Sequence, residues 1–416
     1  MEAVKIERIV FVQISLVHYQ FPRLSALSVE CRKRGIAFSN IELTGFNKEY
    51  PWITGSERAG FSNTTLFPGE YLDKIGTKKV WKSLQNVLEE SKPDVLFIYG
   101  YSLKVMRLAK AWADKRDIAT VLMSDSNRFD KRRYWFLEVW KKSFVSRFDG
   151  AFVGGTSSSR YVQSLGIPIE RVACGLDVID ISFFEQTSTE ARSRIDAVRR
   201  QWNLPERYFL FVGRLIREKN LQVLLRAYKN YVEFCRKGIS PWDLVICGSG
   251  PMETEIRNTV QDLPEPVRER IHRFGHINQP EVIDFFTCAS CFVLPSISES
   301  WGLVINEACA SGLPVIVSKT AGCARDLVAQ DGNGWVFDPE NIDELSDLMV
   351  RATSQDETDR NMMGQRGKDL LSEWGLDRYT SEVLSIAEIA RIYRKSKNQS
   401  SDREPRRIFL MNRVLR

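Results

Sequence analysis

Long apolar runs are absent from this 416-residue sequence. No stretch approaches the roughly 18 consecutive apolar residues that a membrane-spanning helix needs. The first residues, MEAVKIERIVFVQISLVHY, carry Glu2 and Glu7 beside a short apolar run and offer no small-residue cleavage site. We therefore expect a first strand here rather than a signal peptide. The expected location is the cytoplasm, including a peripheral position at the inner face of the membrane.

Sequence patterns for disulfides, metals and phosphate loops are missing as well. The eight cysteines follow no framework spacing, so without an export signal we expect reduced thiols, several of them in the core. Cys288 and Cys291 form a C-x2-C pair, but no second pair or histidine stands at metal-ligand spacing. Neither an Asp-x-Asp pair nor a G-x4-G-K-[ST] loop occurs. These absences argue against a metal site and against P-loop phosphate binding.

Positive charge is not spread evenly along the chain. The formal net charge is +6, but residues 391–416 contain nine Lys or Arg and two Asp or Glu, and so carry +7. The remainder of the chain therefore sums to about −1. Because the basicity belongs to the tail, the sequence predicts no nucleic-acid-binding face and no nucleic-acid partner.

Two similar series of alternating strands and helices make up the chain. Its length, with 43% hydrophobic and 27% charged residues, predicts a globular protein of two domains. Apolar strands such as RIVFVQISLV at 8–17 and YFLFVGR at 208–214 precede helical stretches, which is the βαβ rhythm of parallel sheets. The predicted divisions are a first domain at 1–170, a linker at 171–205, a second domain at 206–375, a C-terminal helix at 376–396 and a basic tail at 397–416.

Two stretches of the first half interrupt this rhythm. Residues 46–70 are rich in aromatics, Gly, Ser and Thr without periodicity, which predicts a functional loop. Residues 125–148 place aromatic side chains such as Trp135 and Trp140 at helical spacing, with Lys and Arg on the other faces. We favour a helix packed on the sheet with its basic side in water. The alternative is an amphipathic helix that lies on an anionic membrane.

The most informative stretch is VLPSISESWGLVINEACASGLPVIV at 293–317, which predicts a strand, a loop, a helix and a second strand. Glu299 lies in the loop and Glu307 on the helix, with Gly302 between them, where a glycine lets backbone approach a ligand closely. The first N–H groups of a helix lack intrahelical partners and attract an anion. Carboxylates on both sides of an anion site suit a phosphate flanked by hydroxyl-rich groups. A nucleotide sugar is the resulting hypothesis.

Two further loops of the second half follow strands and carry glycine or charge. Gly213 and Arg214 begin the first of them and Lys219 lies near its end, where cations can reach a diphosphate. Gly248 and Gly250 lie in the second loop. Taken alone, each loop is weak evidence, since surface charge is the more common explanation for such cations.

Five stretches of the second half stand in the order and at the spacing of one known family. They are FVGRLIREKN, ICGSGP, FGHI, LPSISESWGLVINEACASGLPVIVS and AGCARDLV. Together they resemble the C-terminal half of a retaining family-4 glycosyltransferase of the GT-B type (glycosyl transferases group 1), and the Glu299–Glu307 pair matches its E-x7-E motif. The resemblance is specific over about residues 208–340 and weak over residues 1–165. It implies two Rossmann-like, doubly wound α/β domains that face a central cleft, with a C-terminal helix that crosses back to the first domain.

The resemblance also implies a role for each matching residue. Arg214 and Lys219 would hold the donor diphosphate and stabilise the departing nucleoside diphosphate, Glu299 would face the donor sugar, and Glu307 would accept hydrogen bonds from the ribose. The other donor-binding residues implied in this way are Gly213, Gly248, Gly250, His276, Ile277, Ser300, Gly302 and Leu303. Fixed cations and a helix terminus would replace a metal. No metal or cofactor is therefore expected beyond the co-substrate, a nucleotide-diphosphate sugar of the UDP or GDP type.

The first half departs from the family at one strand end. Many relatives carry a histidine where this chain has Ser124-Asp125-Ser126. Asp125 either orients the acceptor hydroxyl or contacts the donor sugar, or it is a helix N-cap. His18, at the end of the first strand, either contacts the acceptor or the transferring sugar, or is a histidine satisfied within its loop. Both residues are candidate catalytic groups, and both pairs of interpretations stay open.

The resemblance implies a metal-independent retaining hexosyltransferase that moves a sugar from a nucleotide-diphosphate sugar to an acceptor hydroxyl. The acceptor would be a carbohydrate or a lipid-linked molecule of surface polysaccharide, lipopolysaccharide or glycolipid assembly, with peripheral contact to an anionic membrane. A nucleotide-sugar epimerase of the same fold is one alternative, although the aromatic segment at 46–70 argues mildly against it. A catalytically inactive GT-B binding or scaffold protein is the other, although the presence of Arg214, Lys219, Glu299 and Glu307 argues against it.

Overall fold

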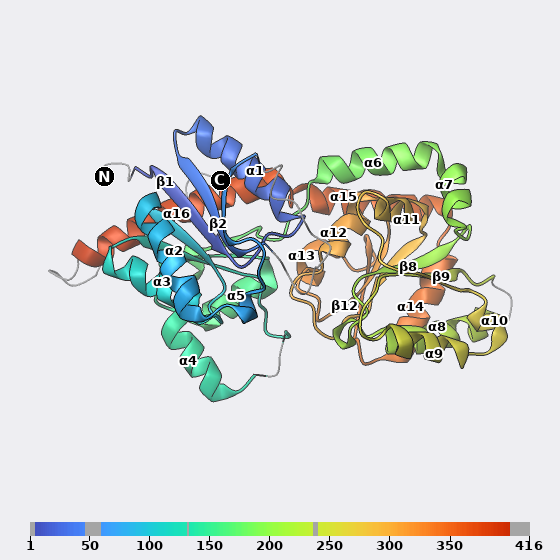
Figure 1. Ribbon diagram of the computed structural model, residues 1–416. Helices are drawn as coiled ribbons and strands as arrows, with labels where there is room; N and C mark the ends of the chain where they lie inside the picture. The colour runs from blue at the N-terminus through green and yellow to red at the C-terminus, as the bar shows by residue number, and fades with distance from the viewer. Residues whose placement is uncertain (1–4, 46–59, 131–132, 236–239, 400–416) are drawn as a thin grey trace.

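Two parallel β-sheets, one in each half of the chain, form the centres of two lobes (Figure 1). The structure, a computed structural model, describes residues 5–45, 60–130, 133–235 and 240–399. Among these residues the first sheet has seven strands in the order β3-β2-β1-β4-β5-β6-β7, and the second has six in the order β10-β9-β8-β11-β12-β13. All the pairings are parallel, so the chain returns through a crossover connection between paired strands.

The strands are short and most are buried along their length, as expected for sheets covered on both faces. The first sheet consists of β1 (Arg8–Gln13), β2 (Ala37–Thr44), β3 (Ser62–Phe67), β4 (Val95–Tyr99), β5 (Ala119–Ser124), β6 (Gly150–Val153) and β7 (Val172–Cys174). The second consists of β8 (Tyr208–Val212), β9 (Asp243–Cys247), β10 (Ile271–Phe274), β11 (Cys291–Leu294), β12 (Val315–Ser318) and β13 (Gly334–Phe337).

Helices connect the strands and cover the sheets. In the first lobe they are α1 (Gln20–Lys33), α2 (Thr77–Ser91), α3 (Lys104–Lys115), α4 (Trp135–Val145) and α5 (Thr156–Ser164). Helices α6 (Ile181–Ser193) and α7 (Ile195–Trp202) lead into the second lobe, which contains α8 (Leu221–Cys235), α9 (Glu253–Gln261), α10 (Glu265–Arg268), α11 (Val282–Cys288), α12 (Leu303–Ala310), α13 (Ala324–Leu327), α14 (Ile342–Ser354) and α15 (Glu357–Ser372). Single 3-10 turns occupy Leu72–Lys74, Ile169–Arg171 and Arg217–Lys219.

The last helix, α16 (Leu376–Gln399), crosses from the second lobe back to the first, which confirms the predicted crossing (Figure 1). It packs against α1 and against the strands β5, β6 and β7. Tyr379 places its ring 5.3 Å from that of Phe152 on β6. One buried cluster of apolar side chains accordingly continues from the first sheet through α16 into the second lobe. The two lobes therefore share part of their core.

The predicted loop at 46–70 is wrong for its final part. Residues 62–67 form β3, which pairs with β2 at the edge of the first sheet. Among the described residues this strand has a neighbouring strand on one side only, and it is polar and half-exposed, so it lacks the apolar alternation that predicts an interior strand. Residues 46–59 lie outside the described residues, as do residues 400–416 of the basic tail.

The favoured interpretation of residues 125–148 is also wrong. Residues 125–130 belong to a loop, and α4 begins only at Trp135. Val145 is the only residue of α4 that is fully buried, and the aromatic side chains near the start of the helix are exposed. The helix therefore does not bury its aromatic face against the sheet. Within the described ranges, no helix of the protein is long and apolar enough to span a bilayer.

Candidate active site

Several predicted residues meet where the carboxyl ends of the strands of the two lobes come together. Parallel sheets of this kind bind ligands in the crevice beyond those strand ends. A cavity of about 710 Å³, which we call the cleft cavity, is lined mostly by loops of the first lobe. The lining side chains that matter below are His18, Tyr19, Arg23, Asp125, Asp177 and, from the second lobe, Leu303.

Glu299 lies in the loop after β11, and its carboxylate is held by the second lobe. Lys219 donates a hydrogen bond to Oε2, and the Oγ of Ser296 donates to the same oxygen at 3.2 Å. The side chains of Lys219 and Glu299 are only 14% and 17% exposed. Because water reaches them poorly, each charge depends on the other for compensation. The two predicted residues are therefore brought together as an ion pair at the cleft.

A glycine starts the helix beside this ion pair. Gly302 is the N-cap of α12 and has φ +103°, a left-handed conformation that favours glycine. A Cβ atom there would lie 3.1 Å from Cδ2 of Leu294 and 3.4 Å from Cγ of Glu299. Leu303, the first residue of the helix, lines the cleft cavity. The N–H groups of this helix start therefore lie next to Glu299 and its partner Lys219, and a helix start and a nearby cation both favour an anion.

Glu307 lies on α12, about one turn after the helix start, and is 2% exposed. Its Oε1 accepts a hydrogen bond from the hydroxyl of Tyr19 at 2.5 Å and another from Nε2 of Gln279 at 3.0 Å. Burial raises the pKa of the Glu307 carboxyl to about 7, and these two hydrogen bonds oppose the rise. The carboxyl is thus a buried acceptor whose donors come from both lobes. Sequence patterns did not point to Tyr19 or Gln279, because neither belongs to a motif.

The glycine-rich loops after β8 and β9 pack directly on each other. A Cβ on Gly248 would stand 1.9 Å from the carbonyl oxygen of Gly213, and one on Gly250 would stand 2.6 Å from that of Leu215. Both glycines also have positive φ, at +147° and +158°. Close loop packing thus explains these two glycines without a ligand. Arg214, between the two contacts, is half-buried in the same loop.

The segment after β10 reaches the site through one residue that was not predicted. His276 is exposed, and its Nε2 pairs with Oδ1 of Asn278 at 2.9 Å. Ile277 packs partly buried against the shared core. Gln279, three residues after His276, provides the contact to Glu307. The predicted His276 and Ile277 therefore flank the site, while Gln279 enters it.

Asp125 and His18 both line the cleft cavity. The N-cap interpretation of Asp125 is wrong, because the next helix begins at Trp135. Burial raises the pKa of the Asp125 carboxyl, and the hydroxyl of Tyr99, 3.5 Å from Oδ2, opposes that rise. Burial lowers the pKa of His18 to about 4, and its Nε2 has no hydrogen-bond partner. His18 is therefore a neutral imidazole at neutral pH and is not satisfied within its loop.

Arg23 and Asp177 form a buried pair in the wall of the cleft cavity that the sequence did not suggest. Nη1 of Arg23 lies 3.7 Å from Oδ1 of Asp177, and Nε of Arg23 donates to the carbonyl of Val178 at 2.8 Å. They are 5% and 7% exposed, yet Nη2 of Arg23 and Oδ2 of Asp177 have no partner. Burial raises the pKa of Asp177 to about 7, against the opposing charge of Arg23. No local motif marks these residues, which are far apart in the chain.

Hydrogen bonds between the lobes hold the Glu299 loop in place. Nδ2 of Asn127, in the loop after β5, donates to the carbonyl oxygens of Glu299 and Ser300 at 3.0 and 3.1 Å. Asp326 accepts hydrogen bonds from the backbone N–H and the hydroxyl of Thr156, at the start of α5. The first lobe thus fixes the backbone on which the predicted donor-binding residues stand.

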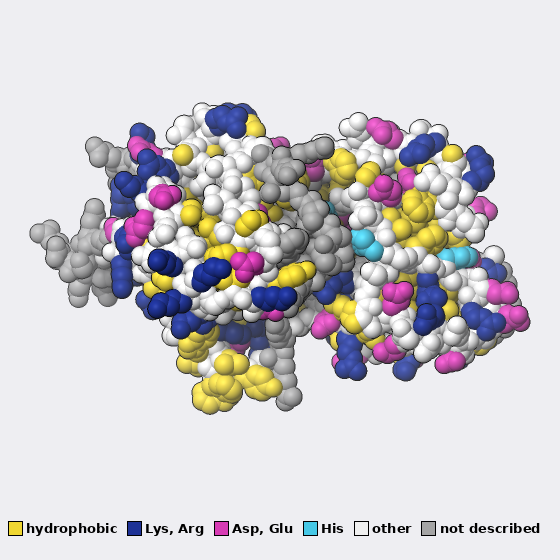
Figure 2. Space-filling model, in the orientation of Figure 1, with side chains coloured by type: hydrophobic (Ala, Val, Ile, Leu, Met, Phe, Trp, Pro, Cys, Tyr) yellow, Lys and Arg dark blue, Asp and Glu magenta, His cyan; other side chains and the backbone are white. Residues whose placement is uncertain are grey.

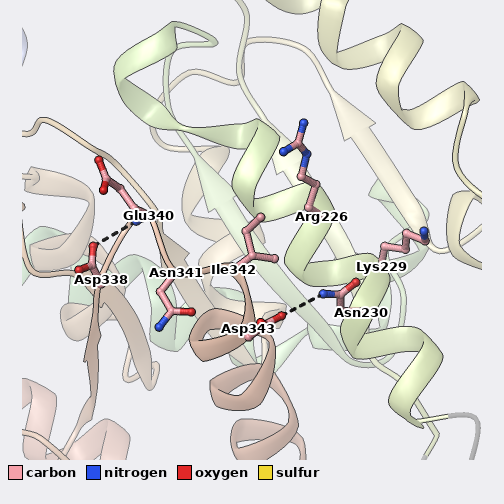
Figure 3. Close-up of a pocket in the computed structure, with 8 residues that line it drawn as sticks. All are labelled: Arg226, Lys229, Asn230, Asp338, Glu340, Asn341, Ile342 and Asp343. Atoms are coloured by element: carbon pink, nitrogen blue, oxygen red, sulfur yellow. Dashed lines mark hydrogen bonds between the residues drawn. The ribbon is translucent and has the colours of Figure 1, made fainter.

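A second hollow lies on the second lobe, between α8 and the start of α14 (Figure 3). Its side chains carry mixed charges, and two contacts close it: Asn230 to Asp343 at 3.4 Å, and the backbone N–H of Glu340 to Asp338 at 3.2 Å. None of its lining residues lines the cleft cavity or belongs to the Glu299 loop. The hollow is therefore separate from the candidate active site.

Comparison with known proteins agrees with this geometry. Residues 194–370 match the family described as Glycosyl transferases group 1. An uncharacterized glycosyltransferase of Methanocaldococcus jannaschii is 30% identical over 44% of this chain and 45% of its own length. The O-antigen chain mannosyltransferase B of Escherichia coli is 23% identical over 67% of this chain and 70% of its own. The match thus spans about half the length of the archaeal relative.

The whole chain also resembles solved structures. HepE of Anabaena, in complex with UDP, superposes with a TM-score of 0.68 at 14% identity, over 91% of this chain and 98% of that one. At this identity the likeness concerns the fold, which is the two-lobed GT-B architecture predicted from the sequence. Residues 194–370 therefore match the group 1 glycosyltransferases, and the whole chain has the GT-B fold.

Proposed function

We propose that the protein is a retaining glycosyltransferase that moves a sugar from a nucleotide-diphosphate sugar to an acceptor hydroxyl without a metal. The observation that carries this proposal is the arrangement around α12. Glu299, which pairs with Lys219 of a neighbouring loop, the helix start at Gly302 and the buried Glu307 follow one another in this order along a single strand–loop–helix unit. This order matches the order of sugar, diphosphate and ribose in such a donor.

Each residue of this arrangement has a defined contact in the proposed complex. Arg214, Lys219 and the first N–H groups of α12 would hold the diphosphate, because cations and a helix terminus stabilise the charge that develops on the leaving group. Glu299 would accept from hydroxyls of the donor sugar. Glu307 would accept from the ribose, in exchange for the hydroxyl of Tyr19 that it binds in this structure.

The proposed reaction occurs on one face of the sugar. The acceptor oxygen forms a bond to the anomeric carbon as the bond from that carbon to the diphosphate oxygen breaks. The acceptor proton passes to the departing diphosphate. This retains the anomeric configuration and needs no enzymic nucleophile. Asp125 and neutral His18, which line the cleft cavity, would accept hydrogen bonds from the acceptor or the transferring sugar.

The relatives support a donor and acceptor of this kind. Solved structures of the same fold contain UDP or UDP-glucose, and one relative transfers mannose to an O-antigen chain by its name. We therefore propose a UDP or GDP sugar as the donor, and a carbohydrate or lipid-linked acceptor of surface polysaccharide, lipopolysaccharide or glycolipid assembly.

The test is to incubate the purified protein with a panel of UDP and GDP sugars and to measure nucleoside diphosphate release and the configuration of the product. Arg214→Ala and Glu299→Ala should each lower the rate by about 100-fold or more, as loss of a transition-state contact does. Arg217→Ala and Glu218→Ala, exposed neighbours in the loop after β8, are the matched controls and should leave it unchanged. Activity that survives both Arg214→Ala and Glu299→Ala would refute the assignment. A sugar isomer formed without any acceptor product would indicate an epimerase instead.

A further inference from the structure

The outer surface of α4 is the largest group of exposed apolar side chains among the residues that the structure describes. Figure 2 shows it as a yellow cluster at the free end of the first lobe, where Figure 1 places α4. We call this group the α4 patch; its members and their exposed fractions are Tyr134 46%, Trp135 79%, Phe136 53%, Leu137 43%, Val139 61% and Trp140 46%. Contiguous exposed apolar surface of this kind marks an interaction site on a protein that is otherwise monomeric.

Helix α4 turns its aromatic side chains outward and its acidic residue inward, the opposite of an ordinary surface helix. Glu138, the acidic residue of the helix, is turned toward the protein and is 26% exposed. It accepts hydrogen bonds from Lys141 at 2.7 Å and from the hydroxyl of Tyr161 at 3.0 Å. A solvent-facing helix buries its apolar side and exposes its polar side. The arrangement here, with the polar residue inside and the aromatic residues outside, suits an apolar partner.

The patch is held firmly on the lobe at one end of the helix. Val145 is fully buried, and the ring of Phe144 lies 5.8 Å from that of Phe148 and 6.3 Å from that of Tyr101. At the other end, the guanidinium of Arg133 lies over the ring of Tyr161 at 4.2 Å. The aromatic side chains between these anchors are therefore presented outward by a fixed helix.

Charge around the patch favours an anionic lipid surface as its partner. Between Arg128 and Arg147 the sequence has seven Lys or Arg and two Asp or Glu, and Glu138 pairs with Lys141 and Arg133 of the same stretch. Arg128, Lys142 and Arg147, which lie in or near α4 in the sequence, are exposed, and Arg147 also lies 3.7 Å from Asp114. Trp and Tyr rings favour the membrane–water interface, and each nearby Lys or Arg adds about 1 kcal/mol of attraction to an anionic leaflet.

A second copy of the chain is a poor partner for the same reason. A twofold dimer through this surface would place each basic rim against its own copy. Like charges opposed across an interface suppress association. An anionic membrane satisfies both the aromatic face and the basic rim.

The patch is connected to the cleft cavity through α3. Leu103 and Lys104, at the start of α3, line the cavity, and Arg107, one turn later, lies over the ring of Trp140 at 5.5 Å. We propose that α4 docks on an anionic bilayer, inserting the α4 patch among the lipid headgroups, so that the cavity receives an acceptor carried by a lipid. The choice of a lipid-carried acceptor rests on the proposed function, whereas the docking itself does not.

The experiment measures co-sedimentation of the full-length protein with vesicles of phosphatidylcholine, with and without phosphatidylglycerol. We expect binding to the anionic vesicles, weaker binding in high salt because salt screens the charges, and little binding to phosphatidylcholine alone. The variant Trp135→Ser/Phe136→Ser/Val139→Ser should lower the fraction bound by about tenfold or more. Phe234→Ser and Met362→Ser, at exposed positions of the second lobe, are the matched controls and should bind as the native protein does.

The charge contribution has its own pair of variants. Arg128→Glu/Lys142→Glu should weaken binding to anionic vesicles and leave binding to neutral vesicles unchanged. Arg226→Glu/Lys229→Glu on α8 makes the same change of charge away from the patch and should have little effect. All samples keep residues 400–416, so the basic tail contributes equally to each.

Three results would overturn the docking proposal. They are native-like sedimentation of the triple serine variant, equal binding of the native protein to neutral and anionic vesicles, and a patch that captures only an acidic protein while vesicles stay unbound. If the triple variant is poorly folded by circular dichroism, Trp135→Ser alone repeats the test at the most exposed side chain. Nucleoside diphosphate release without vesicles is measured in parallel. Absence of nucleoside diphosphate release from the native protein both with and without vesicles refutes the proposed function but not the docking, and any release without vesicles should be retained by the triple variant.

Discussion

Glu307 is a buried carboxyl of the site whose ionisation lowers the stability of the fold. Its carboxyl is 2% exposed, and burial raises its pKa from an ordinary value of 4.5 to about 7. A buried acid with a raised pKa stabilises the fold below its unfolded pKa, and this contribution is lost as the pH rises through the folded value. Ionised Glu307 therefore costs the fold stability, and in the proposed complex the same carboxylate accepts hydrogen bonds from the ribose hydroxyls.

Glu307→Gln should consequently change how stability depends on pH. Between pH 4.5 and 7 the native protein should lose up to about 3 kcal/mol that the variant keeps. The melting temperature of the variant should equal that of the native protein near pH 4.5 and exceed it above pH 7. Differential scanning calorimetry across this range measures the effect. Glu253→Gln, at an exposed position of α9, is the control, and a pH-independent difference for Glu307→Gln would contradict the prediction.

His18 makes a second prediction at this scale. Burial lowers its pKa to about 4, and the charges of Arg23 and His276 act in the same direction. We therefore expect its imidazole to stay neutral down to about pH 5, and to take no part as a protonated acid in transfer at neutral pH. Proton NMR of the His18 ring during a pH titration tests this, with His18→Gln for assignment. A titration midpoint near 6.5 would show that the ring is exposed to water.

The strand–loop–helix unit around Gly302 depends on one backbone conformation. Gly302→Ala forces a side chain into φ +103° and brings Cβ to 3.1 Å from Leu294. We expect a loss of about 1–3 kcal/mol in the free energy of unfolding, with much weaker nucleoside diphosphate binding because the helix start moves. Gly275→Ala is the control, since its Cβ would meet nothing within 4 Å. Urea unfolding and calorimetric titration measure the two effects, and equal results for both variants would contradict this account.

Sequence patterns predicted this unit well and its surroundings poorly. The order of strand, loop and helix at 293–317 follows from local apolar runs and turn residues, and the parallel two-lobed fold is confirmed. The hydrogen bond from Tyr19 to Glu307 joins residues 288 positions apart, so no local pattern reveals it. The same applies to Arg23 beside Val178, 155 positions away. The strand β3 and the outward orientation of α4 were not predicted, because in neither element do the apolar side chains mark a buried face.

At the scale of the whole molecule, α16 fastens the first lobe through a buried charge network. Arg394, whose side chain is 7% exposed, binds Asp114 at 2.7 Å and Asp117 at 3.2 Å and lies 3.6 Å from Asp149. Asp149 is fully buried and also accepts from the backbone N–H of Thr120 on β5. Removing one partner of a buried ion pair leaves an uncompensated charge.

Arg394→Ala should therefore lower the free energy of unfolding by about 3–5 kcal/mol. Arg351→Ala breaks an ion pair with Asp331 in which both side chains are 51% exposed, and it should cost about 1 kcal/mol or less. Denaturant titration of both variants measures the difference. If the two variants lose equal stability, the network of α16 does not fasten the lobe.

The crossing of α16 has a consequence for the order in which the protein is made. The seven-stranded sheet is complete once residue 174 has been synthesised, but the helix that covers β5, β6 and β7 begins only at Leu376. About 200 residues must leave the ribosome in between, which takes roughly 10–40 seconds at ordinary translation rates. During that interval the apolar face of β5, β6 and β7 is not yet covered by α16. Synthesis, rather than diffusion, thus sets when the first lobe can finish folding, and chaperones have that interval in which to act.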